Sequence, residues 1–155
     1  MKIGLISDTH DNLEKIKKAV KLFNSKKVEL VLHAGDFVAP FTINYLDRLN
    51  CQYLGVFGNN DGEKQGLTKK SGGKIKEGPI ELALGNLKIA LVHDINTLAS
   101  GDFDIVVFGH SHKKELKKEG KTLFVNPGEC GGWLTGKSTV AILDTDKLSV
   151  KFFNI

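Results

Sequence analysis

Side chains that bind metals or exchange protons follow the apolar runs of this chain in short polar clusters. The most compact cluster is the pair His110 and His112, which follows the apolar residues 105–108 and encloses a single serine. Either these histidines are ordinary polar residues at a strand end, or they point together at something that binds imidazole. The full set of clustered residues is Asp8, His10, Asp36, Asn59, Asn60, Asp61, His93, His110 and His112. Because four of the five histidines fall in this set, one shared site is favoured over scattered strand-end residues.

The donor atoms of these clusters favour a transition-metal site. Two aspartates, one asparagine and four histidines offer oxygen and imidazole nitrogen, with no thiolate. This mixture suits Mn²⁺, Fe²⁺, Ni²⁺ or Zn²⁺, whereas Mg²⁺ and Ca²⁺ sites favour oxygen alone. Seven donors exceed the needs of one tetrahedral ion and suit two ions that share a carboxylate. Two ions about 3.5–4 Å apart can hold a bridging hydroxide and clamp a phosphoryl group for in-line attack. The residue types therefore predict hydrolysis of phosphate esters.

The elements that position these clusters are predicted to be strands of a parallel sheet. Residues 2–7, 29–33 and 52–57 are apolar runs, and each precedes a polar cluster. Residues 13–24 carry apolar side chains at steps of three and four, which is the pattern of a helix face. Strands that alternate with helices are typical of an α/β fold. Since ligands bind at the carboxyl ends of such strands, we expect the clusters to meet there.

The boundaries of the helices follow from their first residues. Asp11 and Glu14 have the spacing of a capping box for the first helix, and Pro40 is a favourable first residue for a second. Residues 62–78 are rich in lysine and glycine with little apolar periodicity, so we expect an exposed loop with at most a turn of helix.

The second half of the chain is predicted to consist mostly of strands. Gly85–Asn86 and Glu119–Gly120 are turn signals between alternating apolar residues, and each indicates a hairpin. A third tight turn is expected at residues 144–147. With 155 residues and no linker, the chain is expected to form one domain over residues 1–155.

Charge and cysteine content limit the partners and the compartment. The net charge of +4 comes from lysines and a single arginine, Arg48, which argues against a long nucleic acid as partner. Cys51 and Cys130 form no paired motif, which is typical of a reducing compartment. No apolar stretch has the length of a membrane span, and the first residues lack the features of a signal peptide. We therefore expect a cytoplasmic protein, and the sequence leaves homo-oligomer formation open.

The polar clusters resemble, in order and spacing, the DxH…GD…GN…H…GHxH signature of the calcineurin-like metallophosphoesterases. The segments that carry the resemblance are SDTH at 7–10, AGD at 34–36, GNND at 58–61, His93 and GHSH at 109–112. The similarity is greatest to the small single-domain phosphodiesterases of archaea and bacteria. It implies an α/β fold, a four-layer α-β-β-α sandwich in which two mixed sheets pack face to face between flanking helices. It also implies a metal-dependent hydrolase of phosphodiesters.

The resemblance also implies a role for each clustered residue. Asp8, His10, Asp36 and His112 would hold the first metal ion; Asp36 would bridge to the second, which Asn59, His93 and His110 would also hold. Mn²⁺ is the expected ion at both positions, with Ni²⁺, Fe²⁺ and Zn²⁺ as alternatives. Asp36, Asn60 and His110 are the predicted catalytic residues, and Asn59 and Asn60 the predicted substrate-binding residues. Asn60 stands where many family members have histidine, so it can hydrogen-bond a phosphoryl oxygen but cannot act as a general acid.

Several residues near the motifs have ordinary structural interpretations. We interpret His33 as an inward residue that supports a ligand, and Asp61 and Glu63 as solvated or structural. The sequence assigns no role to Glu129 or Cys130.

Two other functions compete with the enzyme. A relative of this family in the retromer coat keeps the fold but works as a protein-binding scaffold; every expected metal ligand is present here, so the scaffold ranks below the enzyme. A nuclease acting on long DNA would need a larger chain, so small phosphate esters are the expected substrates.

Overall fold

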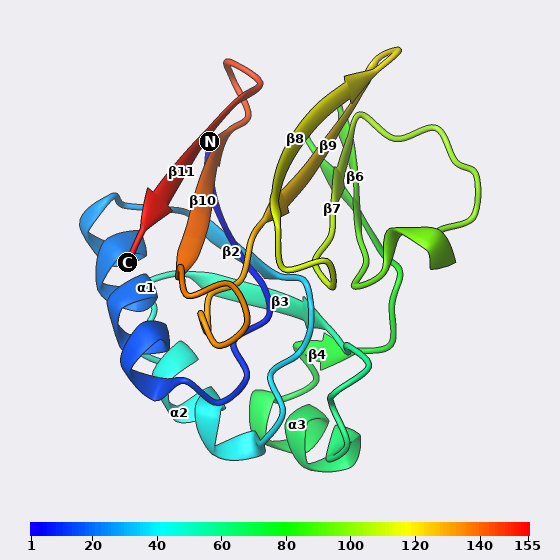
Figure 1. The fold of residues 1–155 in the computed structure, drawn as a ribbon. Coiled ribbons are helices and arrows are strands. Elements are labelled where there is room, and N and C mark those ends of the chain that lie inside the picture. Colours follow the sequence, from blue (N-terminus) through cyan, green and yellow to red (C-terminus); the bar gives the residue numbers. More distant parts are fainter.

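The computed structural model describes residues 1–155 and contains two mixed β-sheets that pack face to face (Figure 1). The first sheet has the strand order β11-β10-β1-β2-β3-β4. Its strands are β1 (Lys2–Ile6), β2 (Leu30–His33), β3 (Gln52–Val56), β4 (Ile75–Lys76), β10 (Thr139–Asp144) and β11 (Ser149–Asn154). Strands β1 to β3 run parallel, as predicted; β4 joins them in parallel beside β3, and β10 pairs antiparallel with β1. The parallel strands therefore all end at one edge of the sheet.

The second sheet has the strand order β5-β6-β7-β9-β8. Its strands are β5 (Ile80–Leu84), β6 (Leu87–Leu91), β7 (Ile105–Val107), β8 (Lys114–Glu119) and β9 (Thr122–Pro127). The hairpins β5–β6, β8–β9 and β10–β11 confirm the three predicted turns. The edge strand β8 is exposed along its whole length, and its lysines keep that edge solvated.

Helices cover the outer face of the first sheet, as Figure 1 shows. They are α1 (Leu13–Ser25), α2 (Ile43–Leu46) and α3 (Lys64–Ser71), and a 3₁₀ turn at Pro40–Thr42 leads directly into α2. Ile16, Val20 and Phe23 of α1 pack in one buried cluster with residues of β1 and β2. A second buried cluster fills the space between the two sheets, and a third covers the outer face of the second sheet with the segment around Phe103 and the 3₁₀ turn Ile95–Thr97. The predicted four-layer α/β sandwich is confirmed.

Two local predictions are wrong. Asn12, and not Asp11, caps α1, because its side chain accepts a hydrogen bond from the backbone of Lys15 at 3.3 Å. The Asp11 carboxylate instead accepts one from the backbone of Ala39 at 3.0 Å.

Residues 62–78 are not an exposed loop, because they form α3 and β4. Leu67 and Ile75 are fully buried and anchor this segment to the core. Gly72 ends the helix in the left-handed conformation, with φ of 64°.

No helix of the structure combines the length and the apolar character that crossing a membrane would require.

Candidate metal centre

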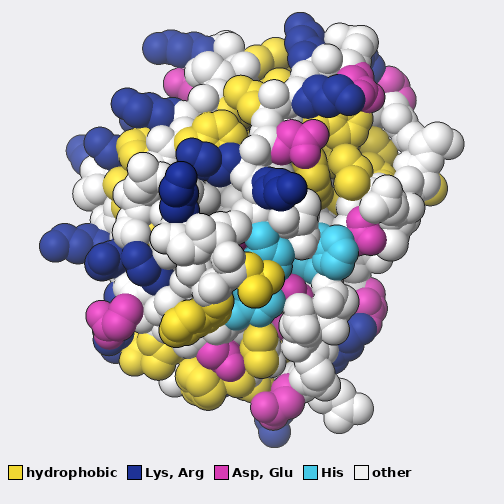
Figure 2. All heavy atoms as spheres, viewed as in Figure 1, with side chains coloured by type: hydrophobic (Ala, Val, Ile, Leu, Met, Phe, Trp, Pro, Cys, Tyr) yellow, Lys and Arg dark blue, Asp and Glu magenta, His cyan; other side chains and the backbone are white.

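The ends of five strands bring the predicted metal ligands together. Asp8 follows β1, Asp36 follows β2, Asn59 follows β3, His93 follows β6 and His110 follows β7. Because the two sheets pack face to face, the clusters from β1 to β3 meet those from β6 and β7 at the same edge. Figure 2 shows the histidine side chains gathered on one face of the molecule. The structure thus places all seven predicted ligands at one site.

The first half of the site consists of Asp8, His10, Asp36 and His112. One potential ligand atom from each of these residues lies within 4.8 Å of all the others. His10 Nε2 is 3.4 Å from Asp36 Oδ2, and His112 Nε2 is 3.7 Å from Asp8 Oδ1. The rings of His10 and His112 stack with their centroids 5.1 Å apart. Four donors therefore surround one small volume, as the resemblance implied.

The second half of the site consists of Asp36, Asn59, His93 and His110. Asn59 Oδ1 lies 2.8 Å from His93 Nε2 and 2.9 Å from His110 Nδ1. His93 Nε2 is also 3.6 Å from Asp36 Oδ1. Asp36 therefore faces the first half with Oδ2 and the second half with Oδ1, which is the arrangement of a bridging carboxylate.

The donor geometry fits divalent ions. Two donors bound to one ion at about 2.1 Å each lie roughly 3.0–3.4 Å apart. The separations of 3.4–3.7 Å between carboxylate oxygen and imidazole nitrogen are close to that range. Two buried ligand atoms of the first half, Asp8 Oδ2 and His10 Nε2, have no hydrogen-bond partner, and His112 Nδ1, which has none either, faces Glu129 at 3.4 Å. An unpaired buried polar atom lowers the stability of the folded protein by about 1–3 kcal/mol. The first half of the site is therefore suited to a bound ion that contacts these atoms.

The backbone at the site adopts an unfavourable conformation. Asp8, His10, Asp36, His110 and His112 all have positive φ, between 41° and 67°. Non-glycine residues rarely occupy this left-handed region, and each occurrence costs of order 1 kcal/mol. Five of the seven predicted ligands adopt this unfavourable conformation, which indicates that the fold holds their side chains in place for function.

Close approach of the strand-end loops requires glycine at two positions. A Cβ atom on Gly58 would lie 2.1 Å from Asp36 Oδ1 and 2.5 Å from the Asp36 backbone nitrogen. A Cβ atom on Gly109 would lie 2.9 Å from the Ala34 carbonyl oxygen and 3.0 Å from Asp8 Oδ2. The GN and GH motifs therefore use glycine to let the ligand loops touch.

Asp61 and His33 are buried close to the predicted metal ligands. Asp61 accepts hydrogen bonds from the backbones of Asp36, Val38 and Gly58 at 2.7–3.1 Å, so of its two predicted interpretations the structural one is confirmed. Burial raises the pKa of the Asp61 carboxyl despite these bonds. The Gly35 backbone donates to His33 Nδ1 at 3.2 Å, so His33 Nε2 carries the proton and faces Thr9 Oγ1 at 3.2 Å. Burial holds the pKa of His33 well below its usual value, so His33 is neutral.

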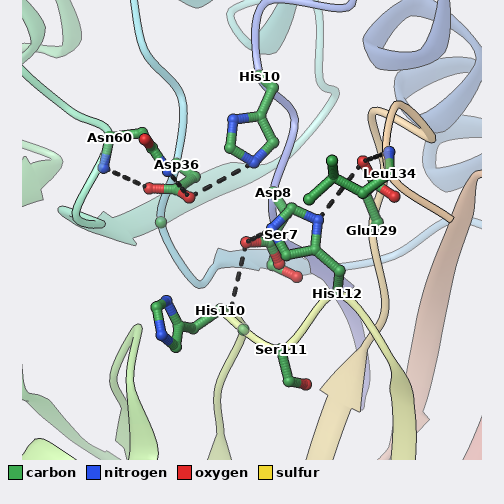
Figure 3. A network of polar contacts seen from close by, with 12 residues as sticks. Ser7, Asp8, His10, Asp36, Asn60, His110, Ser111, His112, Glu129 and Leu134 are labelled. Carbon is green, nitrogen blue, oxygen red and sulfur yellow. Dashed lines mark hydrogen bonds and ion pairs between the residues drawn. The ribbon is translucent and has the colours of Figure 1, made fainter.

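Asn60 and the backbone of His110 donate hydrogen bonds to the two predicted aspartate ligands, Asp36 and Asp8. Asn60 donates its backbone N–H to Asp36 Oδ1 at 2.9 Å and its side-chain amide to Asp36 Oδ2 at 2.8 Å. Figure 3 shows Asn60, Asp36 and His10 side by side. Asp8 is fully buried and accepts a hydrogen bond from the His110 backbone at 3.2 Å. Burial raises the pKa of the Asp8 carboxyl.

Glu129 is a site residue that the sequence left unassigned. Its side chain is fully buried, and its Oε1 lies 3.4 Å from His112 Nδ1, on the opposite side of the ring from Asp8 (Figure 3). It also accepts hydrogen bonds from the backbones of Leu134 and Thr135 and from the Thr135 hydroxyl, at 2.7–3.0 Å. Burial alone would raise the pKa of Glu129, but these hydrogen bonds outweigh it and the pKa lies below its usual value. Glu129 is therefore a carboxylate directed at a predicted metal-binding histidine.

Asn126 is a second residue that sequence reasoning missed. It is fully buried, and its side-chain amide donates to the Gly109 carbonyl at 2.8 Å and to Ser111 Oγ at 3.1 Å. These bonds fix the turn that carries His110 and His112. Only its position before Pro127 and Gly128 distinguished it in the sequence, and that pattern indicates a turn.

Comparison with known proteins decides the family. A model of the calcineurin-like phosphoesterase superfamily domain matches residues 1–148. The chain belongs to the calcineurin-like phosphoesterase superfamily. It is 40% identical over 157 aligned positions to the phosphodiesterase MJ0936 of Methanocaldococcus jannaschii, with 95% of each chain covered. These findings confirm the family and the phosphoesterase class that the motifs predicted.

Solved structures confirm the fold of this family. A structure described as a novel archaeal phosphodiesterase superposes with a TM-score of 0.93 at 38% identity and covers both chains completely. Vps29 of Chaetomium thermophilum superposes with a TM-score of 0.74 at 20% identity, covering all of this chain and 95% of that one. At that identity the similarity shows the fold alone, and it adds no support to the scaffold alternative.

Proposed function

We propose that this chain is a phosphodiesterase that hydrolyses small phosphodiesters with two divalent metal ions. The observation that carries the proposal is the position of Asp36, whose two carboxylate oxygens face His10 on one side and His93 on the other. One carboxylate between two sets of donors is the arrangement that a pair of ions requires. The close relative named a phosphodiesterase supports the same reaction for this chain.

The residues of the chain would divide between two ions. Asp8, His10, Asp36 and His112 would hold one ion, and Asp36, Asn59, His93 and His110 the other. When bound, such a pair supplies positive charge that activates water and neutralises phosphoryl oxygens. His93 Nδ1 lies 2.7 Å from the Ala34 carbonyl oxygen, which fixes a proton on Nδ1 and leaves Nε2 free to bind a metal.

The substrate would be oriented by asparagine where other family members use histidine. The Asn60 amide lies beside Asp36, at the junction of the two halves. From there the Asn60 amide can donate a hydrogen bond to a phosphoryl oxygen that lies next to Asp36, between the two halves of the site. It supplies no proton to the leaving group, because an amide does not act as an acid near neutral pH. We therefore expect esters with good leaving groups to react fastest.

Further features of this proposal concern the ion and the cell. Mn²⁺ is the proposed ion, since mixed carboxylate and imidazole donors suit it, and Ni²⁺, Fe²⁺ and Zn²⁺ share that suitability. We propose a cytoplasmic enzyme acting on a small phosphate ester, with residues 1–155 as one domain. Long nucleic acids are not proposed as substrates, because the chain has a single arginine.

A direct test combines metal removal with a substrate panel. Purified protein is stripped with a chelator, reloaded with Mn²⁺, Ni²⁺ or Mg²⁺, and assayed on phosphodiesters and phosphomonoesters. We expect hydrolysis only after reloading, with diesters preferred over monoesters. Hydrolysis that is equal with and without metal, or no hydrolysis under any condition, would refute the proposed function.

A further inference from the structure

A cavity of about 270 Å³ opens directly beside the second half of the metal centre. Asn59, His93 and His110 form one of its walls. Its remaining wall is mostly polar and includes Lys64, Glu77, Asp94 and Thr97. In Figure 3 the His110 ring lies on the Asp36 and Asn60 side of the view, while the His112 and Glu129 pair lies on the other. The cavity therefore adjoins one flank of the place where the phosphoryl group would sit.

A phosphodiester carries two ester groups. If its phosphoryl group is held between the two halves of the metal centre, one ester group lies beside the second half, where the cavity opens. This step rests on the proposed function. The volume suits a group of sugar or polyol size, because the pockets that hold whole drug-sized ligands measure about 300–1,000 Å³. The cavity is thus large enough for one small ester group.

The polar wall selects the chemistry of that group. Glu77 Oε1 accepts a hydrogen bond from Lys64 at 2.8 Å, and Glu77 Oε2 has no partner in the protein. Asp94 Oδ1 accepts hydrogen bonds from the backbone and side chain of Asn96 at 3.0 and 2.9 Å, and its Oδ2 is likewise unpartnered. The Thr97 hydroxyl donates to the Asp94 carbonyl oxygen at 2.7 Å, so it meets a ligand as an acceptor. The wall therefore presents free acceptors, which match a ligand rich in hydroxyl donors.

The charge of the wall disfavours a second anion. Apart from the metal ligands, the wall carries two carboxylates, Glu77 and Asp94, against the single cation Lys64. Lys64 is already paired with Glu77. An ester group with its own phosphate or carboxylate would face net negative charge there.

We propose that this cavity is a subsite for the neutral, hydroxyl-bearing ester group of the phosphodiester substrate. Glu77 and Asp94 recognise the hydroxyl groups, and they determine specificity for a polyol or sugar ester over an alkyl or anionic one.

The test uses para-nitrophenyl diesters that differ only in the second ester group. Propyl, dihydroxypropyl and carboxyethyl groups share three carbons and differ in hydroxyl content and charge. Hydrolysis is measured as the monoester formed directly, with any cyclic phosphate quantified separately, because a neighbouring hydroxyl can itself displace p-nitrophenolate. We expect kcat/KM for the dihydroxypropyl diester to exceed that for the propyl diester by roughly tenfold, mainly through KM, and the carboxyethyl diester to be the poorest. A double variant, Glu77→Gln with Asp94→Asn, should lower the dihydroxypropyl-to-propyl ratio at least threefold, because hydrogen bonds to neutral amides are weaker.

A charge-matched control separates local from general effects. The Glu14→Gln and Glu81→Gln double variant removes two exposed carboxylates outside the cavity, and should keep the wild-type ratio. Equal kcat/KM for the propyl and dihydroxypropyl diesters in active wild-type protein would overturn the subsite. A preference for the carboxyethyl diester would overturn it too, since Lys64 would then dominate. No hydrolysis of any diester with any metal would refute the proposed function itself.

Discussion

Replacing Glu129 by glutamine should weaken metal binding without a direct change to any metal ligand. Glu129 Oε1 lies 3.4 Å from His112 Nδ1, and the opposite ring nitrogen, Nε2, faces Asp8. When Nε2 binds a metal, Nδ1 carries a proton, and a carboxylate next to it increases the basicity of the ring. The Glu129→Gln change keeps the size of the side chain and removes its charge.

The expected loss follows from the hydrogen bond that a protonated His112 Nδ1 would donate to Glu129 when a metal binds at Nε2. A hydrogen bond to a charged group contributes about 1.5–3 kcal/mol and a neutral one about 0.5–1.5 kcal/mol, so the difference is about 1–2 kcal/mol. Since every 1.4 kcal/mol is tenfold, metal affinity should fall roughly 5- to 30-fold. Glu129 is fully buried, so solvent does not reduce this value. Calorimetric titration of Mn²⁺ into chelator-treated protein measures it.

The same carboxylate also fastens residues 134–135, so a control is needed for that structural role. Thr135→Val removes the hydroxyl that donates to Glu129 Oε2 at 2.7 Å, on the side away from His112. It should lower the free energy of unfolding by about 1 kcal/mol and leave metal affinity within twofold. If Glu129→Gln binds Mn²⁺ as tightly as wild type, or if Thr135→Val weakens binding equally, Glu129 only anchors the loop and the reasoning is refuted.

Three further predictions follow from the site. Burial holds the pKa of His33 well below the unfolded value of about 6.5, so below about pH 6.5 protonation of His33 favours the unfolded chain and lowers the free energy of unfolding. Urea unfolding of metal-free protein should therefore show about 1.4 kcal/mol less stability at about pH 5.5 than at about pH 7.5. This loss should be absent in His33→Gln. Gly109→Ala should cost about 1–3 kcal/mol, since its Cβ would lie 2.9 Å from the Ala34 carbonyl; an unchanged unfolding midpoint would contradict that clash. Asn60→His should raise hydrolysis of alkyl esters more than of activated aryl esters, and equal, unchanged rates would count against reliance on good leaving groups.

The strand-end clusters were predictable because strong local patterns specify them. Apolar runs that end in SDTH, AGD, GNND and GHSH define both the strands and the residues after them. Parallel strands must then bring those ends together. Local patterns thus predicted the parallel strands and the meeting of Asp8 and Asp36 at their ends, whereas the four-layer sandwich was predicted only through the resemblance to the family.

The missed features depend on contacts between distant segments. Asn12 caps α1 in place of Asp11, whose carboxylate is drawn to the Ala39 backbone. The segment 62–78 is held by only two fully buried apolar residues, Leu67 and Ile75, so its polar composition concealed a helix and a strand. Glu129 is one acidic residue among many until the fold brings it to His112. No local pattern encodes such a contact.

The central claim is that the site holds two ions and that Asp36 belongs to both. Native mass spectrometry of Mn²⁺-loaded protein measures the number of ions bound to each chain. We predict two ions for wild type, one for Asp8→Asn, one for His93→Ala and none for Asp36→Asn, with folding checked by circular dichroism. One ion in wild type, or two ions retained in Asp36→Asn, would contradict the account.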